Sequence, residues 1–132
     1  MTVLEINFFN FKFQTNPMQT LKAFVPTTNP AKAKSFYRDT LGLALKSEDS
    51  FALEFDDHGT PLRITTVQTF TPHPFTVLGW DVTDITKSIK SLREKGVTFE
   101  IYKGLQQDEL GIWTAPSGTK VAWFKDPDGN TL

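Results

Sequence analysis

The sequence contains no cysteine, which excludes disulfide bonds, thiolate metal ligands and thiol nucleophiles. It has only two histidines and no apolar run near the roughly 18–20 residues that cross a bilayer. Its 14 basic residues nearly balance its 15 acidic residues, so net charge offers no attraction to nucleic acid or to an anionic membrane. We therefore expect neither as a partner, and a reducing cytoplasm as the location.

The composition is that of a globular protein, with 39% hydrophobic and 22% charged residues. We expect a single domain over residues 18–132, divided into modules of about 18–70 and 71–132. Residues 1–17 are β-prone and aromatic, yet they lack the basic start and cleavage site of a secretory signal. They are interpreted as an extra edge strand, a dimer arm or non-native upstream sequence. The last is favoured because exposed apolar edges promote aggregation.

The sequence contains the same series of expected elements twice: a strand, a capped helix that ends at a glycine, and further strands. Residues 21–25 predict a strand, and Asn29 followed by Pro30 predicts the start of a helix. Apolar residues then recur at i, i+3, i+4 and i+8 on one helical face. Gly42 supplies the left-handed stop of that helix. Three strands are expected after it, near residues 43–47, 51–55 and 62–66.

The second copy follows about 54 residues later. A strand is expected over residues 75–82, Thr83 or Asp84 caps a helix, and Gly96 ends it. Further strands are expected near residues 97–102, 111–114 and 120–124, with a last one from residue 130. Repetition of a βα unit restricts the fold more than any single motif in this chain.

The second copy closes with Asp126-Pro-Asp-Gly-Asn130. This motif, with Ser35-Phe-Tyr37, Leu41-Gly-Leu43 and the helix end at residues 91–96, resembles the vicinal oxygen chelate superfamily. That group includes glyoxalase I, extradiol dioxygenases and bleomycin resistance proteins. The resemblance covers residues 21–132 and implies an α+β fold: two tandem βαβββ modules forming a curled mixed sheet around a cleft. It also implies a homodimer. The closing motif itself is expected to form a turn and to contact no ligand.

Enzymes of this superfamily hold a divalent metal through His, Glu or Gln side chains on strands of both modules. Those positions fall on Lys22, on Arg63 or a neighbour, and on about Val77, while a fourth falls past Leu132. An ammonium and a guanidinium repel a metal, and valine has no donor. We therefore expect no metal and no cofactor, with a divalent metal as the alternative.

The two histidines do not change this expectation. His58 sits in an Asp-Asp-His-Gly turn, and His73 stands between two prolines in the loop that joins the modules. Both are interpreted as loop residues in contact with solvent. A facial triad would require both loops to converge on one point.

Three tryptophans fall on expected strands of the second module: Trp80, Trp113 and Trp123. They are interpreted either as core residues or as the lining of a cleft for a flat or amphipathic small molecule. Trp80 is the first choice for a ligand contact, because its strand would face the cleft. Trp113 is the second choice, on a hairpin that would form a rim or flap. Phe24, on the first strand, is also a ligand-binding candidate.

Arg63 is the main polar candidate for ligand binding. It alternates with Leu62 and Ile64, so it lies on the opposite face of its strand from them. If those two face the helices, Arg63 enters the cleft and binds a ligand carboxylate or phosphate. In the other register it is a solvated surface charge.

The leading hypothesis is a metal-free small-molecule binding protein of this superfamily, similar in kind to the drug-sequestering resistance proteins. The alternative is a metal-dependent lyase, epimerase or dioxygenase whose ligands are not identified above. A third hypothesis is a structural or regulatory module whose own side chains fill the cleft. The catalytic residues, if any exist, and the identity of the ligand cannot be assigned from the sequence.

Overall fold

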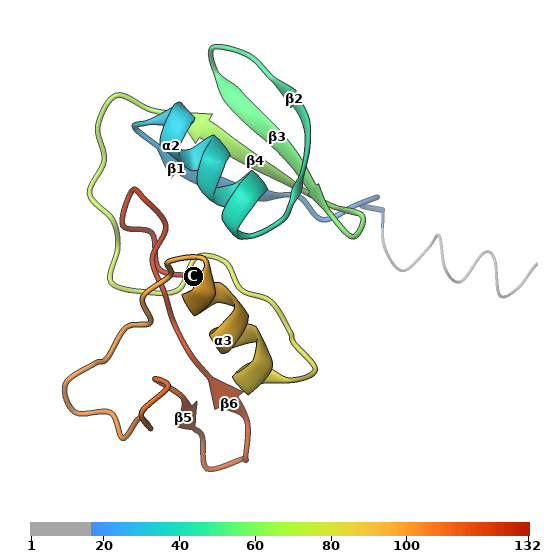
Figure 1. Ribbon diagram of the computed structural model, residues 1–132. Coiled ribbons are helices and arrows are strands. Elements are labelled where there is room, and N and C mark those ends of the chain that lie inside the picture. The colour runs from blue at the N-terminus through green and yellow to red at the C-terminus, as the bar shows by residue number, and fades with distance from the viewer. Residues whose placement is uncertain (1–16) are drawn as a thin grey trace, which may run out of the picture.

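The computed structural model describes residues 17–132 (Figure 1). The predictions for the N-terminal extension therefore lie outside the described residues, apart from Pro17. Within the described part, no helix is both long and apolar enough to cross a membrane. The fold is mixed α+β, as the sequence predicts, with one helical segment in each half of the chain.

The first module is a four-stranded sheet with a helical segment packed against one face. Its strands are β1 (Ala23–Thr27), β2 (Ala44–Glu48), β3 (Ala52–Asp57) and β4 (Thr60–Thr66). They are arranged in the order β1-β4-β3-β2, with β1 and β4 parallel and the other neighbours antiparallel. The strands expected for this half of the chain are therefore confirmed, with small shifts at their ends.

Local capping interactions set the helix boundaries in both modules. Asn29 Oδ1 accepts a hydrogen bond from the N–H of Lys32 at 3.1 Å, at the start of α2 (Pro30–Ser35). In the second module, Asp84 caps α3 (Ile85–Glu94) in the same way. Gly42 and Gly96 follow the two helical segments with φ of +79° and +91°, where a side chain would be strained.

The first helical segment differs from the sequence prediction in its second half. It continues beyond α2 as a π-helical turn, η1 (Phe36–Thr40), closed by a hydrogen bond from the Leu41 N–H to the Phe36 carbonyl. Such wide turns are rare and depend on tertiary context. This turn holds Phe36 and Tyr37, and both rings contact the second module.

The second module follows the same path as the first with far fewer regular strand pairs. Only β5 (Trp113–Thr114) and β6 (Lys120–Val121) form a ladder, as a short hairpin. The strand expected over residues 75–82 is reduced to one parallel bridge between Thr76 and Thr131, and the strand over 97–102 to one bridge at Phe99. These strand predictions were wrong in extent, because β-propensity alone does not supply the neighbouring ladder.

The two modules share one hydrophobic core. In Figure 1 the sheet and α2 lie above, α3 and the β5–β6 hairpin lie below, and the C-terminus lies between them. The most buried apolar residues come from both halves, including Ile64 of β4, Ile89 of α3 and Phe124 near the C-terminus. Phe36 lies 6.3 Å from Phe124, centroid to centroid, across the boundary between the modules.

A buried carboxylate joins the modules at this boundary. Asp126 is only 6% exposed, and its Oδ2 accepts hydrogen bonds from the Tyr37 hydroxyl and from Asn130 Nδ2, each at 2.8 Å. Its Oδ1 accepts the N–H groups of Asp128 and Asn130 at 3.0 and 2.9 Å. We call Tyr37, Asp126, Asp128 and Asn130 the Asp126 junction.

Two further residues of the closing motif also reach the first module. Asp128 Oδ1 accepts the N–H and the hydroxyl of Thr28 at 2.8 and 2.9 Å, and its Oδ2 accepts the hydroxyl of Thr27. Asn130 Nδ2 also donates to the carbonyl of Pro26 at 3.1 Å. The turn predicted for this motif is present, and the motif also fixes how the modules meet.

Asp126→Ala is expected to lower the free energy of unfolding by roughly 3 kcal/mol or more, because four donors lose their acceptor in a buried place. Urea unfolding followed by circular dichroism measures the change. Asp39→Asn is the control, since Asp39 is exposed and its ion pair within residues 17–132 is with its neighbour Arg38. It should change stability by less than about 0.5 kcal/mol. Equal effects of the two variants would contradict the role given to the junction.

Burial, followed by the charge and hydrogen bond of Asp126, raises the pKa of Tyr37 well above its usual value of 10.0. The unfolded chain loses this proton near pH 10, whereas the folded chain keeps it. The stabilising contribution of Tyr37 is therefore complete below pH 10 and falls as the pH rises further. Each pH unit above 10 should cost about 1.4 kcal/mol through this group.

Unfolding of Tyr37→Phe above pH 10 should accordingly release one proton fewer than unfolding of the unsubstituted chain. The variant should also be less stable at pH 8. Urea unfolding at pH 8, 10 and 11 gives the slope directly. Tyr102→Phe is the matched control, because it removes a hydroxyl outside the junction. An unchanged alkaline slope in Tyr37→Phe would contradict the burial of a protonated hydroxyl on Asp126.

Candidate functional site

The sheet of the first module has one buried face and one open face. Val25, Leu62 and Ile64 are at most 3% exposed and belong to the core. Phe24 and Arg63 alternate with them along β1 and β4, so both lie on the opposite face. Of the two registers considered for Arg63, the structure has the one in which Leu62 and Ile64 face the core.

A row of side chains crosses this open face. Phe24, Arg63, Glu54 and Ser47 stand directly opposite one another on β1, β4, β3 and β2. Lys22 precedes Phe24 by two residues, and its ammonium lies 6.0 Å from the centre of the Phe24 ring. We call Lys22, Phe24, Glu54 and Arg63 the open-face cluster.

The open-face cluster places one carboxylate between two cations. Arg63 Nη1 donates to Glu54 Oε1, and Lys22 Nζ lies 3.2 Å from Glu54 Oε2. Partial burial alone would raise the pKa of Glu54, but the hydrogen bonds from Arg63 and Lys22 outweigh it and lower that pKa below its usual range. All three charged side chains keep between 23% and 38% of their surface exposed, so solvent and a ligand can reach them.

A second group of aromatic rings lies in the second module. The Trp123 ring lies 6.3 Å from Trp113 and 5.6 Å from Tyr102, centroid to centroid. Trp123 Nε1 donates to the Thr76 hydroxyl at 3.0 Å, which fixes the orientation of its ring. All three rings are half-buried. We call Tyr102, Trp113 and Trp123 the aromatic trio.

Trp80 lies apart from the aromatic trio. Its ring stacks on Phe124 with 6.4 Å between centroids, and its Nε1 donates to Asp57 Oδ2 at 2.8 Å. Phe124 belongs to the shared core, and Trp80 packs against that core from the outside. Packing and this hydrogen bond account for Trp80 without a ligand. Its assignment as a ligand contact remains a prediction.

The five predicted site residues therefore fall into three places. Phe24 and Arg63 belong to the open-face cluster, Trp113 and Trp123 to the aromatic trio, and Trp80 to the boundary between modules. In Figure 1 the sheet lies at the top of the molecule and the β5–β6 hairpin at the bottom. Among the described residues, Phe24 pairs with Arg63, Trp113 with Trp123 and Trp80 with Phe124, and no hydrogen bond or ring contact joins these three groups to one another.

A shallow groove of about 290 Å³ lies elsewhere, between η1 and loops of the second module. Its walls include Phe36 from η1, Lys95 after α3, and Lys125 and Pro127 near the closing motif. The volume is at the lower limit for small-molecule sites. Lys95 and Lys125 are already engaged, with the carbonyl of Thr40 and with Glu100 respectively.

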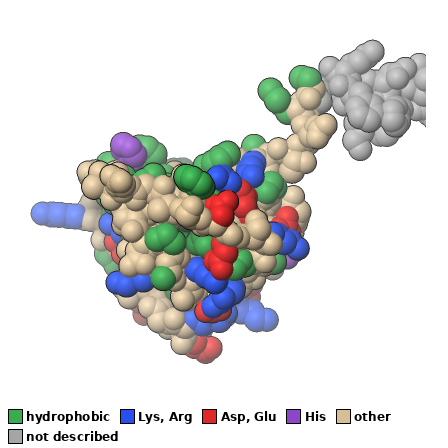
Figure 2. Space-filling view, turned by 90° about the horizontal axis from the view of Figure 1, so that it is seen from above, with side chains coloured by type: hydrophobic (Ala, Val, Ile, Leu, Met, Phe, Trp, Pro, Cys, Tyr) green, Lys and Arg blue, Asp and Glu red, His purple; other side chains and the backbone are tan. Residues whose placement is uncertain are grey.

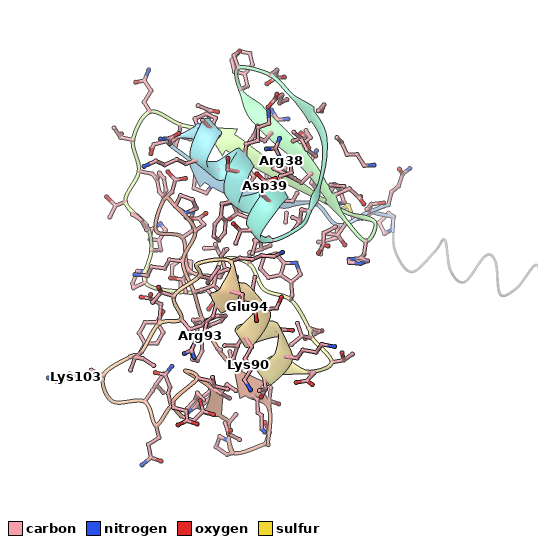
Figure 3. All side chains as sticks on the ribbon, in the orientation of Figure 1. Arg38, Asp39, Lys90, Arg93, Glu94 and Lys103 are labelled. Carbon is pink, nitrogen blue, oxygen red and sulfur yellow. The ribbon has the colours of Figure 1, made fainter. Side chains whose placement is uncertain are left out.

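Charged side chains on the helical segments face solvent. Figure 3 labels residues on η1, on α3 and on a loop of the second module, namely Arg38, Asp39, Lys90, Arg93, Glu94 and Lys103; all six are exposed. On the face seen in Figure 2, basic, acidic and apolar side chains are intermixed, and no single charge dominates. That face therefore has no basic patch of the kind that binds nucleic acid.

The sequence profile of the Glyoxalase/Bleomycin resistance protein/Dioxygenase superfamily matches residues 19–132. The chain belongs to this superfamily. None of the curated proteins compared with the chain matches it. The resemblance drawn from the sequence motifs is therefore confirmed at the level of the superfamily.

Solved structures with the same fold include members with different activities. A bleomycin resistance determinant encoded on transposon Tn5 is 15% identical, with a TM-score of 0.68 over 87% of this chain and 94% of that one. Lactoylglutathione lyase from Agrobacterium tumefaciens is 14% identical, with a TM-score of 0.67 over 88% and 91%. TnmS3, an antibiotic binding protein from Streptomyces sp. CB03234, is 24% identical, with a TM-score of 0.60 over 86% and 91%. At these identities the likeness establishes the fold alone.

The metal-binding positions implied for superfamily enzymes do not suit a metal in this chain. Lys22 and Arg63 present cations there, and the neighbouring Glu54 is already bound by both. Val77 has no donor. Within residues 17–132, no three side chains of His, Cys, Asp or Glu are grouped so that they could hold a metal ion.

The two histidines do not belong to the open-face cluster. His58 has a side chain 96% exposed and contacts Asp57 through Nδ1 at 2.8 Å. His73 stacks on Phe75 with 5.0 Å between the ring centres, in the loop between modules. Each ring is thus engaged by a neighbour close in sequence, and the two loops do not form a ligand set with a carboxylate.

Sequence reasoning missed two members of these groups. Glu54 stands between Leu53 and Phe55 on a strand, so the period of two could have assigned it to the same face as Arg63. Tyr102 gave no such signal, because its neighbours form no regular strand in the structure. Its contact with Trp123 depends on the path of a loop.

Proposed function

We propose that this chain is a metal-free, small-molecule binding protein of the superfamily. The observation that supports it most is the open-face cluster: at the positions implied for metal ligands, two cations hold one carboxylate. Such a surface repels a divalent cation and offers hydrogen-bond donors to an organic ligand. A cytoplasmic location is part of this proposal, since a chain without cysteine needs no oxidising compartment.

Relatives in fold support binding as the function. Two of the proteins with similar structures are a bleomycin resistance determinant and an antibiotic binding protein. Both proteins share the fold at low identity, so they support the class of function and not the ligand. The half-buried rings of the aromatic trio and the exposed ring of Phe24 suit a flat or amphipathic molecule.

The proposal includes a homodimer. The open-face cluster is accessible to solvent and the aromatic trio is half-buried, and large apolar side chains are exposed on the chain, including Phe24 of the cluster at 63% and Phe51 at 71%. A second copy that covers the cluster of one chain with the trio of the other would complete a cleft. It would also remove these apolar side chains from water.

A thermal-shift screen of small aromatic natural products, with and without added divalent metals, tests this function. A ligand present at 100 times its Kd should stabilise the protein by about 2.7 kcal/mol. Arg63→Ala and Trp123→Ala should each weaken its binding roughly tenfold or more. Lys90→Gln is the control, since Lys90 lies on the exposed side of α3.

Three results would contradict the proposal. One is an unchanged affinity for every ligand found, in both variants. Another is binding or turnover that requires a divalent metal and is lost with a chelator, which would favour the metal-dependent lyase, epimerase or dioxygenase. The third is a screen that finds no ligand, which would favour a structural module instead.

A further inference from the structure

The donors of the open-face cluster are only partly used within the chain. A guanidinium has five N–H donors, and a single bond from Arg63, through Nη1, reaches a protein acceptor in the described residues. Lys22 contacts both oxygens of Glu54, at 3.4 and 3.2 Å, and remains 38% exposed. Donor capacity therefore remains on the exposed side of both cations.

An exposed aromatic ring stands beside these donors. Phe24 is directly opposite Arg63 in the parallel pair of β1 and β4, and it is 63% exposed. Its ring also lies near the ammonium of Lys22. A ligand that stacks on this ring would bring a substituent on its edge within reach of the guanidinium.

We propose that the open-face cluster binds a small molecule carrying a carboxylate on an aromatic ring. The inference rests on the proposed function and specifies its ligand class: an anion recognised by Arg63 and Lys22, with its ring on Phe24. A planar carboxylate matches the fork of a guanidinium, which binds it through two parallel hydrogen bonds.

The charge of the cluster favours an anion over a neutral or cationic ligand. Two cations share the single carboxylate of Glu54. Asp49 is negatively charged and attracted to Arg63, but its Oδ1 accepts the N–H groups of Phe51 and Ala52 at 2.8 and 2.9 Å, which hold its carboxylate in its own turn. Asp56 similarly accepts the N–H of Gly59 at 3.1 Å. Glu54 is the carboxylate that contacts both cations directly, so it competes with a ligand for their donors.

This competition gives Glu54 a distinctive signature. If Glu54 only holds the cations in place, Glu54→Gln will weaken anion binding. If it competes with the ligand, as proposed, the same change will strengthen anion binding several-fold, because it removes a negative charge between the cations. The two roles therefore predict changes of opposite sign.

The test is an NMR titration of the full chain with three matched probes: benzoate, benzamide and benzylamine. Benzoate should bind with a roughly millimolar Kd, as expected for so small a ligand. Benzamide and benzylamine should bind at least about tenfold more weakly, because they lack the carboxylate. Backbone shifts along β1 and β4 should report the site.

Variants then assign the contacts. Arg63→Gln and Lys22→Gln should each weaken the binding of benzoate roughly tenfold, whereas the binding of benzamide should change little. Lys34→Gln is the control, since Lys34 forms a similar ion pair with Glu48 elsewhere on the module. The same spectra show whether each variant is folded, and Lys22→Gln keeps the test decisive if Arg63→Gln is not.

Two results would overturn the ligand class while leaving a small-molecule function intact. One is equal affinity for benzoate and benzamide, and the other is a benzoate affinity that neither Arg63→Gln nor Lys22→Gln changes. No benzoate binding at concentrations of tens of millimolar would overturn it as well, including the case in which a second copy fills the site. The proposed function fails separately, if the screen of natural products also finds no ligand.

Discussion

The buried carboxylate of Asp126 is the contact on which the arrangement of the two modules depends. It accepts four hydrogen bonds, and one of them comes from Tyr37, 89 positions earlier in the chain. A carboxylate with so little exposure is stable only while its donors are present. The closing Asp-Pro-Asp-Gly-Asn motif therefore has two roles. It makes the turn that its residues predict, and it binds the first module through Asp128 and Asn130.

This junction determines which surfaces remain for function. The modules meet through the helical side of the first sheet, where Phe36 and Tyr37 of η1 contact the second module. The other side of that sheet stays open and presents Arg63, Glu54 and Phe24 in one row. The half-buried aromatic trio belongs to the second module. The junction and the proposed ligand-binding cluster thus lie on opposite sides of one sheet, so variants on the open face should leave the junction intact.

Sequence patterns predicted the features that arise from neighbours close in the chain. The caps Asn29 and Asp84 and the glycine stops depend on contacts within a few residues, and all are present. The alternation of Arg63 with Leu62 and Ile64 likewise assigns Arg63 to the open face of the sheet, once Leu62 and Ile64 are known to be in the core. The regular strands of the second module were overestimated, because a ladder needs a partner that propensity does not supply. The π-helical turn, the packing of Trp80 on Phe124 and the pairing of Glu54 with Lys22 also depend on contacts between distant segments.

The central claim is that cations replace the metal of superfamily enzymes in this chain. Native mass spectrometry of the gently purified chain tests it most directly, because bound metal, organic ligand and oligomeric state all appear in one mass. The account predicts a dimer whose mass equals that of the bare protein or of the protein with an organic adduct. A dimer or monomer that retains a stoichiometric divalent metal would contradict it.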